Sequence, residues 1–160
     1  MTAAGAVDVV RVGPEDWLRW RALRLEALAD TPIGFGEWHA DALVRPAAEW
    51  QARMRRPGLR LLAVGGGRPV AMAGGFLAGA GPTVFAVYVT PAWRGRGVTD
   101  RLVAAVQEWA GPVGLRLEVH EDNAPATAAY LRLGFARTGG QRCYELDPAR
   151  RLLEMERSAP

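Results

Sequence analysis

The stretch Val87-Tyr88-Val89-Thr90-Pro91-Ala92-Trp93-Arg94-Gly95-Arg96-Gly97-Val98-Thr99 joins a β-branched and aromatic run to a glycine-spaced turn. The run predicts a buried strand over residues 83–89, and the amphipathic segment that begins at Val98 predicts a helix. A strand that passes into a helix through such a turn directs free backbone N–H groups, and the positive end of the helix dipole, at one point. Such a point can bind a phosphate.

The composition of the turn is compatible with two interpretations. Gly95 and Gly97 have no Cβ, so a pyrophosphate could approach the backbone, and Arg94 and Arg96 add positive charge nearby. An ordinary strand-to-helix turn would use the same glycines for its geometry alone. The dinucleotide-binding fingerprint is excluded, because no glycine stands at its third position.

The segments on either side of this stretch predict a mixed α/β fold. Short apolar and alternating runs predict strands at 7–12, 59–64, 69–76, 83–89, 115–120, 142–146 and 152–157. Helical spacing of apolar residues predicts helices over 15–30, 46–54, 98–110 and 123–133, the last with Asn123 as its N-cap. The glycines at 65–67 predict a hairpin turn, and residues 35–43 are expected to be irregular. A chain of 160 residues is expected to form one domain over 1–160.

Missing residue types exclude several kinds of enzyme. All 20 basic residues are arginine, which excludes a Walker phosphate loop, a Schiff-base enzyme and a lysine general base. Ser158 is the only serine and lies near the C-terminus, which excludes a Ser-His-Asp hydrolase. Cys143, His39 and His120 are too few for a zinc site of the Cys/His kind, so no metal is predicted, and Cys143 has no disulfide partner.

Charge and hydropathy limit the partners. The formal net charge is only +3 and the arginines are scattered, which disfavours nucleic-acid binding. Binding of an anionic small molecule would explain the positive surplus equally well. No apolar run approaches the roughly 20 residues of a membrane span. The N-terminus lacks the pattern of a secretory signal. We therefore expect a soluble, cytoplasmic protein with no nucleic-acid or membrane partner.

Two motifs resemble those of the GNAT superfamily of N-acetyltransferases. The acetyl-CoA loop of that family reads Arg/Gln-x-x-Gly-x-Gly/Ala, and its defined positions are occupied here by Arg94, Gly97 and Thr99. The second motif matches 115–123 followed by Ala126, Tyr130, Gly134 and Phe135. The segments 23–28, 35–36 and 154–157 also look like one bacterial branch, so the resemblance covers nearly the whole chain. It implies an α/β (α+β) fold with a central, mainly antiparallel sheet flanked by helices, which splays between the strands ending at Val89 and Val119.

The resemblance also implies a binding site for acetyl-CoA. Backbone groups of Val87 and Val89 would pair with the pantetheine arm as an added strand would. Amides of Gly95, Arg96, Gly97, Val98 and Thr99 would hold the pyrophosphate. Asn123 would lie beside the cofactor at the splay, a role compatible with its capping of the helix. Tyr130 would protonate the departing thiolate; without the motif it would be interpreted as a core tyrosine.

The loop departs from the family pattern at two places. Thr99 stands where the family has Gly or Ala, and it is followed by Asp100, where members often carry a basic residue. A β-branched side chain and a carboxylate close to phosphates should weaken binding of the cofactor. The hydroxyl of Thr99 and the guanidinium of Arg101 could compensate.

Acyl transfer to an amine requires a group that accepts the amine proton. Many GNAT proteins place a glutamate on the strand before the loop, but residues 83–89 contain no acid. Glu118 on the next strand resembles the base of relatives that acetylate protein N-termini; a solvated or Arg-paired strand glutamate is the alternative interpretation. His120, Glu121, Glu37 or an ordered water are further candidates.

The region 33–44 lies where the family builds its acceptor site. Phe35, Glu37 and Trp38 are the candidate acceptor-binding residues there, although such aromatics can also pack a lid against the sheet. The acceptor itself is open between a small molecule and a peptide or protein N-terminus.

These observations favour direct transfer of an acetyl group from acetyl-CoA to a primary amine, in a monomer or homodimer. The alternative is a non-catalytic acyl-CoA-binding or sensing module, suggested by the altered loop and the absent strand acid. A basic nucleic-acid-binding domain is the third and least favoured class.

Overall fold

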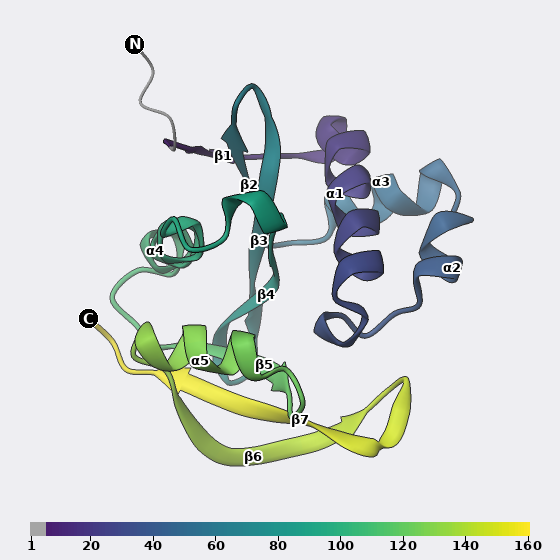
Figure 1. Ribbon diagram of the computed structural model, residues 1–160. Coiled ribbons are helices and arrows are strands. Elements are labelled where there is room, and N and C mark those ends of the chain that lie inside the picture. Colours follow the sequence, from purple (N-terminus) through teal and green to yellow (C-terminus); the bar gives the residue numbers. More distant parts are fainter. Residues whose placement is uncertain (1–5) are drawn as a thin grey trace.

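The computed structural model describes residues 6–160, in which seven strands form one sheet with helices on both faces (Figure 1). Residues 1–5 of the predicted domain lie outside the described residues. The strands are β1 (Asp8–Arg11), β2 (Leu59–Gly65), β3 (Arg68–Ala78), β4 (Gly81–Val89), β5 (Leu115–His120), β6 (Ala136–Tyr144) and β7 (Asp147–Arg157). The α-helices are α1 (Trp17–Asp30), α2 (His39–Leu43), α3 (Ala47–Arg55), α4 (Val98–Ala110) and α5 (Ala124–Arg132).

The strand order is β1-β2-β3-β4-β5-β7-β6, and all neighbours are antiparallel except β4 and β5. The parallel pair has only one registered position, Thr83 opposite Arg116. Beyond it the two strands part, while each keeps its antiparallel neighbour on the other side. The predicted mixed fold, with a mainly antiparallel sheet that splays between its central strands, is confirmed.

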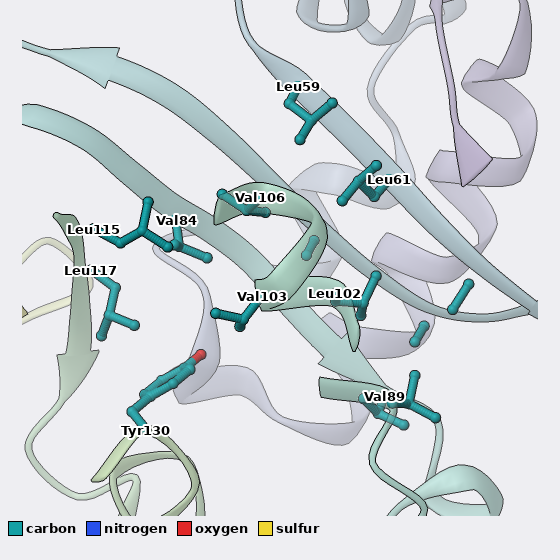
Figure 2. Close-up of a cluster of buried hydrophobic side chains, with 14 of the residues drawn as sticks. Leu59, Leu61, Val84, Val89, Leu102, Val103, Val106, Leu115, Leu117 and Tyr130 are labelled. Carbon is teal, nitrogen blue, oxygen red and sulfur yellow. The ribbon is translucent and has the colours of Figure 1, made fainter. Parts of the chain in front are cut away.

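Two apolar cores cover the two faces of the sheet. Alternation along β2 sends Leu61 to one face and Leu62 to the other. On the first face α4 and α5 pack over β2–β5; Figure 2 shows the side chains of α4 against the strands, with Tyr130 beside them. On the second face α1 and α3 pack over Leu62, Met72 and Tyr88. The splay therefore opens between elements that are each fixed by a core.

Local signals placed most elements correctly. Asn123 caps α5, its Oδ1 accepting from the Ala126 N–H at 3.3 Å. Gly66 and Gly67 have positive φ at the β2–β3 turn, as the hairpin prediction requires. None of the helices in residues 6–160 is long and apolar enough to cross a membrane.

Two predictions about secondary structure were wrong. Residues 35–43, expected to be irregular, include the short helix α2. The last two strands are longer than 142–146 and 152–157, and Leu146 lies outside both of them. Residues 136–143 of β6 are all exposed, so their sequence lacks the alternation of buried and exposed residues that predicts a strand. Their extended conformation depends on pairing with β7.

Candidate active site

The splay between β4 and β5 opens into a cavity of about 660 Å³. Its walls come from both strands, the turn before α4, the inner face of α5 and the loop between α1 and α2. The cavity therefore borders both the glycine turn and the region in which the sequence predicts the acceptor site.

A β-bulge shapes β4 where it borders the cavity. Met72 pairs with Tyr88 and Gly74 pairs with Phe85, so Ala86 and Val87 share one opposing residue of β3. Ala86 has φ +55°, which is uncommon for a residue with a Cβ. A bulge bends a strand and increases its twist. No sequence signal marks Ala86 for this conformation, so the bulge is not predictable from the sequence.

The backbone of β4 after the bulge faces the cavity without a partner strand. The Thr90 N–H donates to the Val70 carbonyl at 2.8 Å, so the Val89 carbonyl on the other side of that peptide points away from β3. It accepts from Nε of Arg94 at 2.9 Å. Val87 and Val89 both line the cavity, as expected for residues that would pair with an extended ligand.

The turn before α4 is open at its glycines. Gly95 and Gly97 both have φ +73°, and a Cβ built on either would meet no atom within 4 Å beyond its chain neighbours. Gly97 is the N-cap of α4, so the first amides of that helix have no intrahelical acceptor. Gly95, Gly97, Val98 and Thr99 line the cavity, and Asp100 lies beside them.

The two arginines of this turn have different positions. Arg94 lines the cavity, and its Nη2 donates to Asp30 at the end of α1 at 2.5 Å. This hydrogen bond lowers the pKa of the Asp30 carboxyl. Arg96 instead stacks on Trp93, with Cζ 4.9 Å from the ring centroid, and is not among the residues that line the cavity.

Tyr130 projects from α5 into the cavity wall. Its ring packs edge to face on Phe135 at 5.9 Å, and Figure 2 shows the hydroxyl directed away from α5 toward Val103. Burial raises the pKa of the hydroxyl, so Tyr130 is protonated at neutral pH. No residue within 6–160 forms a hydrogen bond to it in this structure. Asn123 lines the same cavity.

Glu118 lies on the polar side of β5 and also lines the cavity. Its Oε2 accepts from Nε of Arg142 at 2.6 Å, and Arg142 also binds Glu145. Glu118 is therefore an Arg-paired strand glutamate, the alternative interpretation of this residue. Glu118 reaches the cavity with a guanidinium already bound.

The three candidate acceptor-binding residues occupy different positions relative to the cavity. Phe35 lines the cavity and packs on Tyr88, with ring centroids 6.5 Å apart. Glu37 lies outside the lining, where it pairs with three arginines at 2.9, 2.6 and 3.5 Å. Trp38 is 53% exposed and also lies outside the lining. Only Phe35 is brought to the cavity.

The cavity wall also contains His120, which the sequence offered as an alternative base, and Tyr144, which the sequence did not single out. His120 is buried at the end of β5, and its ring meets that of Tyr144 edge to face at 4.7 Å. The Tyr144 hydroxyl donates to the Phe35 carbonyl at 3.0 Å. These contacts join the β6–β7 hairpin to the α1–α2 loop. Alternation along 115–120 indicates that His120 lies on the same side as Glu118, but no local pattern predicts Tyr144 as its partner.

Cys143 lies on β6, exposed and outside the cavity lining, where its sulfur contacts Nη1 of Arg151 at 3.3 Å. Within residues 6–160, no group of three or more His, Cys, Asp or Glu side chains is placed to hold a metal ion.

Residues 18–135 match the sequence profile of the acetyltransferase (GNAT) family. The chain belongs to the GNAT family. This match spans both motifs, so the resemblance inferred from the sequence is confirmed.

Curated relatives match this GNAT protein over short stretches. An uncharacterized protein of Mycobacterium leprae is 45% identical over 56 residues, which are 35% of this chain and 16% of that protein. The N-alpha-acetyltransferase RimI of Mycobacterium tuberculosis is 39% identical over 61 residues, which are 38% of this chain and 39% of that enzyme. The chain thus matches less than half the length of these relatives.

Solved structures share all or part of the fold of this GNAT protein. A GNAT acetyltransferase from Streptococcus pneumoniae has a TM-score of 0.75 at 16% identity, covering 97% of this chain and 100% of the other. The PaiA N-acetyltransferase from Thermoplasma acidophilum, in complex with coenzyme A, has a TM-score of 0.69 at 15% identity, covering 96% and 99%. Nourseothricin acetyltransferase has a TM-score of 0.59 at 30% identity, covering 66% and 67%. The predicted GNAT-like architecture is confirmed.

Proposed function

We propose that this GNAT protein transfers the acetyl group of acetyl-CoA directly to a primary amine. The observation that carries the proposal is one cavity that joins an open glycine turn at a helix N-terminus, an unpaired stretch of β4 and the hydroxyl of Tyr130. The coenzyme A complex of the PaiA enzyme, which shares this fold, supports the choice of cofactor.

The residues present fit acetyl-CoA. The space over Gly95 and Gly97 leaves their amides open to a pyrophosphate, and the edge of β4 at Val87 and Val89 can pair with an amide-bearing arm. Arg94 lies at the same end, and release of Asp30 would free it for a phosphate. When bound, acetyl-CoA supplies an activated acyl group and a thiolate leaving group.

Two residues of the chain would take part in proton transfer, one as an acid and one as a base. The buried Tyr130 hydroxyl would donate a proton to the departing sulfur. Glu118, on the facing strand, would accept a proton from the acceptor ammonium after releasing Arg142. No residue of the enzyme needs to carry the acetyl group, and Cys143 lies outside the cavity. The reaction would be direct.

A non-catalytic acyl-CoA-binding module remains the second candidate. Thr99 and the carboxylate of Asp100 stand at the phosphate end of the cavity, and β4 carries no acid. Release of free coenzyme A thiol from acetyl-CoA, measured against a panel of amines, polyamines, amino acids and peptides, separates the two. Acceptor-dependent thiol release supports transfer, and tight binding without release with any acceptor supports the module.

Gly97→Val is expected to raise the dissociation constant for coenzyme A by at least about tenfold, a change of about 1.4 kcal/mol. The branched side chain would fill the open space above the turn and oppose the positive φ of this residue. Calorimetric titration measures the effect. Gly67→Val is the matched control, because Gly67 has φ +77° and equally open surroundings in the β2–β3 turn. Equal coenzyme A affinity in folded Gly97→Val and in Gly67→Val would exclude this turn as the phosphate site.

Glu118→Gln is expected to shift or remove the rise of kcat/KM with pH, because a glutamine cannot accept the amine proton. Glu154→Gln is the control, because Glu154 lies opposite Glu118 in the register of β5 and β7 but outside the cavity lining. The measurement is a pH profile of kcat/KM with an identified acceptor. Superimposable profiles for wild type and Glu118→Gln would leave water or the acceptor itself as the base.

A further inference from the structure

Arg24 of α1 lies in the cavity wall beside Phe35 and has unused hydrogen-bond donors. Its Nε donates to Oε1 of Glu37 at 2.9 Å. Among residues 6–160, none accepts a hydrogen bond from its Nη1 or Nη2, and both nitrogens retain accessible surface although the side chain is only 16% exposed. Arg24 lines the cavity, and its two Nη groups are the part of the guanidinium that Glu37 leaves without a partner.

The guanidinium is held in a fixed plane. Its Cζ lies 4.3 Å from the ring centroid of Phe35, and Phe35 is itself fixed against Tyr88. Stacking on one side and the bond to Glu37 on Nε leave the two Nη groups as a paired donor. Two parallel N–H donors match the two oxygens of a carboxylate.

The other arginines of the cavity wall differ from Arg24. Arg94 belongs to the turn before α4 and is bound to Asp30, and Arg142 is held by Glu118 and Glu145. Arg132 is an exposed residue at the end of α5. Arg24 thus differs from the others in two ways. It is mostly buried, and its Nη groups have no carboxylate partner among the described residues.

The surroundings of Arg24 carry excess positive charge. Arg24, Arg45 and Arg53 all pair with Glu37, and only the exposed Glu49 adds a second carboxylate, 3.9 Å from Arg45. Three guanidiniums against two carboxylates leave a surplus positive charge in this cluster, of which Arg24 is the member that lines the cavity. An anionic group bound at Arg24 would neutralise it.

We propose that Arg24 binds a carboxylate of the acceptor, so that the substrates of this protein are amines that carry a carboxylate in the same molecule, as amino acids do. The inference rests on the proposed acetyl transfer and specifies the substrate class of that site. Phe35, which packs on Arg24, and the apolar residues Ile33, Phe85 and Leu152 elsewhere in the same cavity wall favour an amino acid with an apolar side chain.

The test compares apolar amino acids, each with its amide and its decarboxylated amine, in thiol-release assays. Arg24→Gln is expected to lower kcat/KM for phenylalanine roughly 10- to 100-fold, mainly through KM, and to change kcat/KM for phenethylamine less than about threefold. Arg24→Lys keeps the positive charge beside Glu37 but lacks the two parallel donors, so its kcat/KM for phenylalanine should fall by an intermediate factor. Comparing each variant with wild type cancels the different basicities of the amines.

Arg53→Gln is the matched control, because Arg53 also pairs with Glu37 but lies outside the cavity lining. A second readout needs no turnover: binding of 3-phenylpropionate to the protein saturated with coenzyme A, followed by ligand-observed NMR. Binding should be lost in Arg24→Gln and kept in Arg53→Gln, with coenzyme A affinity the same in both folded variants.

The outcomes separate the two proposals. Carboxylate binding that depends on Arg24, without acetyl transfer to any amine, would reject the proposed function and retain the carboxylate site. A wild-type protein that acetylates phenethylamine and phenylalaninamide as well as phenylalanine would overturn the inference while confirming acetyl transfer. The inference would also be overturned if Arg24→Gln and Arg53→Gln lost 3-phenylpropionate binding equally, or lost the preference for phenylalanine over phenethylamine equally.

Discussion

Tyr130→Phe is expected to lower kcat by at least about 100-fold while acetyl-CoA still binds with nearly wild-type affinity. The hydroxyl lies in the cavity wall without a protein partner among the described residues, and burial raises its pKa, so it holds its proton at neutral pH. A departing thiolate could take that proton. Removing one oxygen leaves the packing of the ring on Phe135 in place, so the loss should appear in turnover and not in folding.

Steady-state kinetics with an identified acceptor, together with calorimetric binding of acetyl-CoA, measures this effect. Tyr88→Phe makes the same chemical change at another tyrosine of the cavity wall, whose hydroxyl is bonded to Glu26 and Asp30. It should cost far less in kcat. A Tyr130→Phe enzyme with near wild-type kcat would show that the thiolate leaves without this acid.

Glu37→Gln is expected to lower the free energy of unfolding by about 3 kcal/mol, because removing one partner leaves buried guanidiniums without their counter-ion. Glu37 joins Arg24 of α1, Arg45 before α3 and Arg53 within α3. The side chain of Arg45 is 8% exposed, so water cannot replace the lost carboxylate there. Urea or thermal unfolding measures the difference.

The pH dependence of this effect follows from the pKa of Glu37. Burial raises that pKa and the ion pairs with Arg24 and Arg45 lower it by more, so the folded value lies below the ordinary 4.5. The stabilisation is therefore complete above about pH 5 and is lost as pH falls through the folded pKa. The difference between wild type and Glu37→Gln should shrink in acid.

Glu49→Gln provides the control for this stability effect. Glu49 is 65% exposed and 3.9 Å from Arg45, and its replacement should change stability by less than about 0.5 kcal/mol. Equal and small effects of both substitutions would show that the arginines around Glu37 are solvated well enough to need no counter-ion.

The sequence alone determined the parts of this protein that depend on neighbours along the chain. The glycines of the turn before α4, the cap at Asn123 and the β2–β3 hairpin all rest on interactions within a few residues. Two family motifs then placed Tyr130 and Glu118 on elements that border one splay, and the structure brings both to the same cavity.

Tertiary structure decided the features that join distant segments. The Tyr144 hydroxyl meets the Phe35 carbonyl across 109 residues of sequence, and Arg142 meets Glu118 across 24. Glu37, a candidate for the acceptor site, is withdrawn from the cavity by arginines whose positions depend on how α1 and α3 pack. Such contacts follow from which elements lie side by side, and a pattern of residues within one segment carries no information about the segment that will face it.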